Sequence, residues 1–229
     1  MKIYMTRKEL LLLSAAGALS SVFPAGTNAD NSTNPEGAGL TLTTSRASLF
    51  APSDIRITGG QFLRNQHADA NYLKQLEPDR MLSWMRKNVG LEPKAEAYGG
   101  WDTGGSFIIG HYLSAVSQMA VATDDSDLRK RSTYVVSDMA QCQIAGGDGG
   151  LYSFSGDRVW FHNVQQGVIR AANTTPWYVT HKTMAGLRDA WFLCKNEQAR
   201  DVLIEMCDWC VEVTSGLTHD QWQKMLGQS

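Results

Sequence analysis

The sequence has no excess of charge of either sign and no hydrophobic run long enough to cross a membrane. It contains 21 lysines and arginines against 23 aspartates and glutamates, which leaves a formal net charge of −2. This balance provides no basic stripe for nucleic acid, and no stretch approaches the roughly 18 consecutive apolar residues of a spanning helix. The sequence therefore predicts no nucleic-acid partner and no membrane span.

Cysteines are few, and their spacing does not suit a metal site. The chain has four of them, at Cys142, Cys194, Cys207 and Cys210. The last two are one helical turn apart in "CDWC", but no second CxxC and no histidine at metal-ligand spacing accompanies them. Core-facing thiols are the commoner explanation of such a pair, and a redox pair or, in an exported protein, a disulfide stays open. We assign no catalytic residue and no metal ligand from these positions.

The N-terminus has the composition of an export signal. Three basic residues precede the apolar run 10–23, and "TNA" before Asp30 is a small-residue cleavage site. The stretch "TRKELLLLSAAGA" resembles a twin-arginine signal with Lys8 in place of the second arginine. We predict a signal peptide over residues 1–29 and a polar linker over 30–48, followed by a domain over 49–229 that is exported to the periplasm or the cell exterior.

Hydrophobic residues recur at helical spacing from Gln61 onward, and strand-like alternation is scarce. The spacing predicts helices over about 62–76, over 81–89 with Pro78 near the first turn, over about 107–122 and over about 127–143. A polar turn at 123–126 separates the last two. The fold class predicted from this pattern is all-α.

The helices form a repeat with an offset of 70 residues. The aligned pairs are His111 with His181, Ala115 with Ala185, Ala120 with Ala190, and Asp138 with Asp208. Each copy consists of a helix, a short polar turn and a second helix. Repeated helical pairs are typical of an α/α toroid or solenoid, in which neighbouring pairs bury each other's apolar faces. We predict about three helical hairpins, a partial (α/α)6 toroid that is either open or the front part of a longer domain.

Glycine-rich and aromatic loops precede or follow these helical pairs. They are "YGGWDTGG" at 98–105, "AGGDGGLYSF" at 145–154 and "NTTPWYVTH" at 173–181. In a toroid such loops open at one end, where the binding cleft lies. Aromatic rings stack on flat ligand faces such as those of sugars, while neighbouring polar groups bind the edges. The candidate substrate-binding residues are Trp101, Asp102, His111, Trp177, Tyr178 and His181.

Each candidate also has a structural explanation. The aromatic residues could cover the ends of the helical bundle, and a histidine at a helix start is often a satisfied core or capping residue. Asp102 either caps a helix or binds. Asp148 in "GGDGG" is either a turn residue or part of a calcium loop, although the evenly spaced carboxylates of an EF-hand are absent.

Four motifs together resemble the N-terminal part of the β-L-arabinofuranosidase-like glycoside hydrolases, family 127 and relatives such as family 146. They are "GGWD", "GHYLSAVS", "GDGGLYSF" and "PWYVTHKTMAGLRDAW", within a match from about Asp54 to Leu226. The resemblance implies a catalytic (α/α)6 toroid, normally followed by β-sandwich domains. It also implies an enzyme that removes β-L-arabinofuranose or related sugars from plant polysaccharide or glycoprotein glycans.

The sequence departs from this family at two points. Many relatives have G-H-x-x-G-H-Y at the helix start, whereas Phe107 replaces the first histidine here. The resemblance also implies a zinc-held cysteine nucleophile, further metal ligands and catalytic glutamates in a segment after "LTHDQWQKML", and the four cysteines do not fall at those positions. We therefore expect zinc only in the full-length family. We expect this chain to be an inactive fragment that lacks the C-terminal half of its domain.

Two alternatives to a hydrolase fragment stay open. One is a non-catalytic carbohydrate-binding remnant that uses the loop aromatics without the chemistry. The other is a helical interaction scaffold with no sugar ligand.

Overall fold

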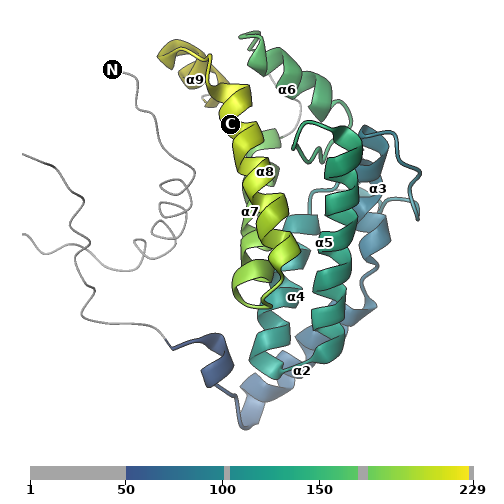
Figure 1. Cartoon of the computed structure of the whole chain (residues 1–229). Coiled ribbons are helices and arrows are strands. Elements are labelled where there is room, and N and C mark those ends of the chain that lie inside the picture. Colours follow the sequence, from purple (N-terminus) through teal and green to yellow (C-terminus); the bar gives the residue numbers. More distant parts are fainter. Residues whose placement is uncertain (1–49, 101–103, 170–174, 227–229) are drawn as a thin grey trace, which may run out of the picture. The chain divides into compact units, whose positions relative to one another are not determined.

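The structure, a computed structural model, describes residues 50–100, 104–169 and 175–226, and the following concerns the compact unit that begins at Ala51. A short 3-10 helix, η1 (Pro52–Asp54), precedes the α-helices (Figure 1). These are α2 (Gly60–Gln75), α3 (Pro78–Asn88), α4 (Ile109–Thr123), α5 (Ser126–Gly146), α6 (Asp157–Gln165), α7 (Pro176–Phe192), α8 (Glu197–Thr214) and α9 (His219–Leu226).

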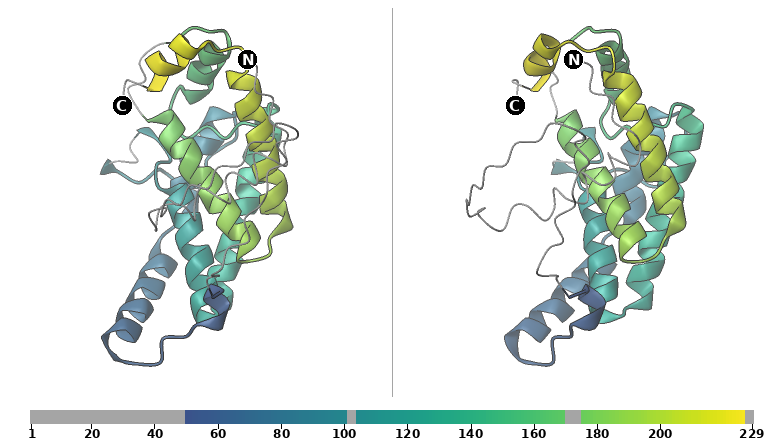
Figure 2. Two further views of the ribbon diagram at one scale, coloured as in Figure 1. Left: turned by 90° about the vertical axis from the view of Figure 1, so that its left-hand side faces the viewer. Right: turned by 60° about the vertical axis from the view of Figure 1, so that its left-hand side comes forward.

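Successive helical hairpins pack side by side in two layers. The first helices of two hairpins, α4 and α7, lie against each other, and so do their second helices, α5 and α8 (Figures 1 and 2). The helices α2 and α3 flank this unit without forming a packed hairpin of their own, and each of them contacts α4 and α5. Among the described residues no strand is present, and one isolated bridge joins Gly105 to Phe154. The prediction of an all-α partial toroid is confirmed, and two packed hairpins, α4–α5 and α7–α8, account for most of it.

The hydrophobic core lies between the two layers. Its members are apolar side chains that are almost completely buried and come from every hairpin. The largest are Phe154, Phe161, Met81, Leu82, Met85, Ile109, Leu113, Leu128, Met139, Leu151, Leu187 and Met206. Each hairpin thus covers the apolar face of its neighbour, as expected of a helical repeat. Within the described residues, no helix combines the length and apolar character that crossing a membrane requires.

The turns of the α4–α5 and α7–α8 hairpins have the same construction. Asp124 and Lys195 adopt left-handed backbone angles, with φ of 56° and 59°. The next residue in each turn, Asp125 or Asn196, caps the following helix with its side-chain oxygen. Such caps satisfy backbone N–H groups that have no partner inside the helix. The polar turns recognised in the sequence are therefore the points where the chain reverses direction between the two helices of a hairpin.

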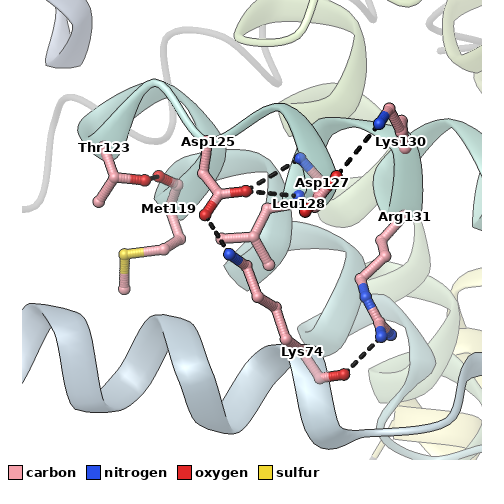
Figure 3. Close-up of polar contacts among 8 residues, drawn as sticks. All are labelled: Lys74, Met119, Thr123, Asp125, Asp127, Leu128, Lys130 and Arg131. Carbon is pink, nitrogen blue, oxygen red and sulfur yellow. Dashed lines mark hydrogen bonds and ion pairs between the residues drawn. The ribbon is translucent and has the colours of Figure 1, made fainter.

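The turn at Asp125 also holds α2 in place. Its Oδ1 accepts hydrogen bonds from the backbone N–H groups of Asp127 (2.9 Å) and Leu128 (3.1 Å), and its Oδ2 pairs with Lys74 of α2 (Figure 3). Arg131 donates to the carbonyl oxygen of Lys74. These contacts stabilise the end of α2, which the apolar core covers only along one side.

Two short helices, α6 and α9, were not predicted. They are 9 and 8 residues long, too short for a helical period to stand out from the surrounding loop sequence. The predicted helix near 107 begins at Ile109, and the helix predicted over 81–89 begins at Pro78.

The glycine loop before α4 is held by the loop after α5. Two backbone hydrogen bonds of 2.6 and 3.1 Å join residues 104–106 to residues 153–155. A Cβ atom on Gly105 would lie 2.2 Å from the ring of Phe154, so only glycine fits there. Phe107, which replaces the family's histidine, stacks edge-on against Phe154 with 4.1 Å between ring centroids.

Candidate functional site

The candidate site rests on an unusually close approach of α4 and α7. A Cβ on Gly110 would lie 2.5 Å from the carbonyl carbon and oxygen of Lys182, and one on Gly186 would lie 2.6 Å from the carbonyl oxygen of Gly110. Glycine at both positions allows the two backbones to touch. Gly110 lies against Lys182, and Gln118 further along α4 bonds to Asp189 further along α7, so the two helices run in the same direction.

His111 and Tyr178 meet across this contact. The hydroxyl oxygen of Tyr178 lies 3.3 Å from Nε2 of His111, and the ring centroids are 6.0 Å apart. Both residues are exposed, with Tyr178 at 50%. The structure therefore brings together two of the predicted residues that lie 67 positions apart in the sequence.

Lys182 completes the group. Its Nζ lies 5.2 Å from the centroid of the Tyr178 ring, one turn along α7. Partial burial lowers the pKa of His111 from its usual value, and the positive charge of Lys182 lowers this pKa further. The imidazole is therefore neutral near pH 7, with one nitrogen that donates and one that accepts a hydrogen bond.

The group lies at one end of an exposed face, the α4–α7 face. Its members recur every three or four residues, which places them on one side of each helix. They are His111, Ala115, Gln118 and Ala122 on α4, and Tyr178, His181, Ala185, Arg188 and Phe192 on α7. His181, which is exposed and follows Tyr178 by three residues, thus joins His111 and Tyr178 on this face.

A polar network continues along this face. The buried carboxylate of Asp189 accepts hydrogen bonds from Ser114 and, at 2.9 Å, from Gln118, and Arg188 lies 3.3 Å from its other oxygen. Beyond the network, a hollow of about 450 Å³ opens between α2 and α4. Lys182 and Asp189 were not identified from the sequence as members of the site. The only sequence signal for them was that charged residues interrupt the helical pattern "HKTMAGLRDAW".

Trp177 lies in a different environment. Its ring packs against those of Phe161 (5.1 Å between centroids), Trp160 (6.4 Å) and Trp209 (6.5 Å). Its indole N–H donates to the sulfur of Met225 at 3.1 Å. The half-buried ring covers the end of the core, and contact of Trp177 with a ligand stays a prediction. Trp101 and Asp102 lie outside the described residues.

The four cysteines are free thiols that pack in or against the core. Burial raises the pKa of Cys142 and of Cys210 to about 12, and it also raises the pKa of Cys207. Cys194 lies 3.6 Å from the carbonyl oxygen of Ser117. The prediction of core-facing thiols is confirmed. A thiol with a raised pKa is a weak nucleophile at neutral pH, because only the thiolate reacts readily.

The resemblance implies zinc ligands only after the motif "LTHDQWQKML", so the described residues do not test that site. Within the described residues, no three histidine, cysteine, aspartate or glutamate side chains gather closely enough to hold a metal ion.

A repeat of packed α/α hairpins is typical of an α/α toroid or solenoid. Residues 54–229 match the family described as beta-L-arabinofuranosidase, GH127 catalytic domain, and the chain belongs to this family. It is thus a glycoside hydrolase domain of the arabinofuranosidase type, and the family implies a glycan substrate. No curated protein matches the chain.

Proposed function

We propose that the α4–α7 face binds a β-L-arabinofuranose or related sugar of a plant glycan, in a glycoside hydrolase exported through the leader predicted over residues 1–29. The observation that carries this proposal is the contact of His111 with Tyr178 at 3.3 Å, which two helices bring together at an exposed face. Membership of the arabinofuranosidase family supports the choice of sugar.

The chemistry of this group suits a sugar. Sugar hydroxyls both donate and accept hydrogen bonds, and so do a neutral imidazole and a tyrosine hydroxyl. The exposed ring of Tyr178 offers an apolar surface for the C–H groups of the sugar ring. Lys182 adds N–H donors on one side of the ring, and His181 adds a second imidazole one turn away.

We further propose that this chain binds the sugar without cleaving it. Glycoside hydrolysis requires two positioned groups, an acid and either a nucleophile or an activated water. The four cysteines of this chain do not fall at the position of the cysteine nucleophile that the resemblance implies. His111 and Tyr178 supply binding contacts, and the proposal gives neither of them a catalytic role.

Calorimetric titration with an L-arabinose-containing oligosaccharide tests the binding. Tyr178→Phe keeps the ring and removes one hydroxyl, so we expect the Kd to rise about threefold to tenfold. His111→Ala should weaken binding by a similar or larger factor. Phe62→Ala is the control, because Phe62 is an exposed aromatic residue on α2, outside the α4–α7 face. Absence of binding by the unmodified chain would contradict the proposal and favour the interaction scaffold.

A hydrolysis assay tests the proposal that the chain binds the sugar without cleaving it. With p-nitrophenyl β-L-arabinofuranoside, zinc and a reductant present, we expect no release of p-nitrophenol. Turnover that disappears in His181→Ala would show that the chain is an enzyme by itself.

A further inference from the structure

A second cavity, of about 360 Å³, lies between α6 and α8, apart from the residues of the α4–α7 face. Its floor consists of three packed aromatic rings. The ring of Trp209 meets those of Tyr152 and Phe161 edge-on, with centroid distances of 5.6 and 4.7 Å. The cavity is in the size range of small-molecule sites. The three rings are nearly completely buried, so they fix the base of the cavity, while the bordering side chains provide most of its accessible surface.

Two pairs of polar side chains border this floor. On one side, Oδ2 of Asp148 accepts a hydrogen bond from the hydroxyl of Tyr152 at 2.7 Å and lies 3.6 Å from Arg158. On the other side, Gln165 donates to Glu212 at 3.0 Å. The side chains of Asp148 and Arg158 stay 38% and 43% exposed, so both have hydrogen-bonding capacity left for a ligand.

The loop "GGDGG" is built to bring Asp148 to this border. Gly149 has a φ of 83°, and a Cβ on it would lie 2.9 Å from the carbonyl oxygen of Glu205. A Cβ on Gly150 would lie 2.8 Å from the indole nitrogen of Trp209. Only glycine allows the loop to press onto α8 in this way. Asp148 also accepts a hydrogen bond from the N–H of Gly150 at 3.1 Å, which confirms it as a turn residue.

We propose that this cavity is a second saccharide-binding site, which takes one sugar unit of a glycan. A fixed apolar floor bordered by both donors and acceptors matches an uncharged ligand with many hydroxyl groups. The lining carries charges of both signs, the carboxylates of Asp148 and Glu212 and the guanidinium of Arg158, so no single strong charge dominates the cavity. The lining of the cavity indicates an uncharged, hydroxyl-rich ligand. The choice of an arabinose-containing probe rests on the proposed function.

The cavity and the α4–α7 face are connected by the aromatic cluster. Trp177, the residue before Tyr178, packs against Trp209 with 6.5 Å between ring centroids. Both sites thus lie at the same end of the helices, where α7 begins and α8 approaches its end. A single glycan chain that contacts both sites would gain affinity from the combined contacts.

NMR spectroscopy of the full chain tests the proposal. The indole N–H signal of Trp209, assigned by its absence in Trp209→Phe, reports on the cavity, and the ring signals of His111 report on the α4–α7 face. The indole signal of Trp191 is an internal control, since this residue packs beside Phe192 at the other end of α7. The probe is an L-arabinose-containing oligosaccharide.

We expect the Trp209 signal to shift on titration while the Trp191 signal does not. Val159→Phe fills the cavity from its exposed border and should weaken the response of Trp209 about tenfold. Val211→Phe is the matched control, because Val211 is an exposed valine on α8 outside the cavity. Glu212→Gln keeps the shape, removes the charge and should weaken the response about threefold.

The readouts separate the two sites. A Trp209 signal that stays unshifted while His111 responds would overturn the second site and leave the proposed function intact. A Trp209 response that vanishes in the double variant His111→Ala, Tyr178→Phe would also overturn it, because the signal would then report the first site. A response of Trp209 without one of His111 would support the cavity and contradict the proposed function.

Discussion

At the scale of single residues, burial and nearby charge determine how the candidate site interacts with a ligand. His111 is only partly buried, yet burial and Lys182 both lower its pKa. A protonated imidazole could only donate hydrogen bonds, whereas the neutral form accepts one as well. Lys182 thus keeps His111 suited to a hydroxylated ligand, and this influence depends on the close contact of α4 and α7 that places the two side chains together.

Asp157 provides a residue-scale prediction of pH dependence. Its carboxylate is 4% exposed and accepts backbone hydrogen bonds from Ser153 (3.0 Å) and Phe154 (2.8 Å). Burial raises the pKa of Asp157 from 3.8 to about 6, although these hydrogen bonds act in the opposite direction. The folded protein therefore holds this proton more tightly than the unfolded chain does.

The sign follows from proton linkage. Between pH 4 and pH 6 the native state binds more protons at Asp157 than the unfolded state, so this group's contribution to the free energy of unfolding falls as the pH rises. The fall amounts to about 3 kcal/mol. Asp157→Asn removes the titration while the amide oxygen can still accept from the backbone.

Urea unfolding of both proteins at several pH values measures this effect. We expect the Asn variant to gain stability relative to the unmodified chain as the pH rises from 4 to 7. A difference in the free energy of unfolding that stays constant with pH would contradict the assignment to Asp157.

At the scale of helices, the contact of α4 with α7 determines the geometry of the candidate site. Gly110→Ala would place a methyl group 2.5 Å from the backbone of Lys182, a clash that no side-chain rotation relieves. The helices would have to separate, and overpacking of this kind costs about 3 kcal/mol. We expect this loss in the free energy of unfolding, together with a weaker contact between His111 and Tyr178.

Chemical denaturation measures the stability, and an NMR titration of the sugar probe measures the site. Gly216→Ala is the matched control, because a Cβ there has nothing within 4 Å. Equal stability of Gly110→Ala and the unmodified chain would show that α4 and α7 can separate without cost.

The sequence predicted the hairpins well because both copies of the repeat place apolar residues on equivalent helix faces. It also placed His111 and His181 at helix starts, whereas Tyr178, which the sequence assigned to the loop 173–181, lies in the first turn of α7. The different environment of Trp177 could not be predicted, because it depends on α7 beginning exactly at Pro176. Adjacent residues on a helix point about 100° apart, so Tyr178 reaches the α4–α7 face while Trp177 reaches the core.

The roles of Lys182 and Asp189 also could not be predicted from the sequence. A charged residue within a helical pattern usually faces solvent, and nothing local distinguishes one that meets a partner on another helix. Ser114 and Asp189 lie 75 positions apart and come together only through the packing of α4 on α7. Such contacts belong to the tertiary structure, and local periodicity does not encode them.

At the scale of the whole molecule, exposed apolar side chains favour association between chains. Phe62 and Tyr72 on α2 are 77% and 60% exposed, and Phe192 on the α4–α7 face is 48% exposed. Between α2 and α4 lies the hollow of about 450 Å³, which Tyr72 and Leu73 help to line. Apolar groups gathered around a hollow gain free energy when another surface covers them.

We therefore predict that the chain self-associates as its concentration rises, and that sedimentation velocity detects this. The double variant Phe62→Lys, Phe192→Lys should shift the distribution toward monomer, because each lysine replaces apolar surface with a charge that resists burial. Ile144→Lys is the control, since Ile144 is 79% exposed on α5, a helix of the other layer, and should leave the distribution unchanged. A monodisperse monomer for the unmodified chain at every concentration would contradict the prediction. It would mean that these aromatic side chains are too scattered to form an interface, and that the α4–α7 face is open to a sugar in solution.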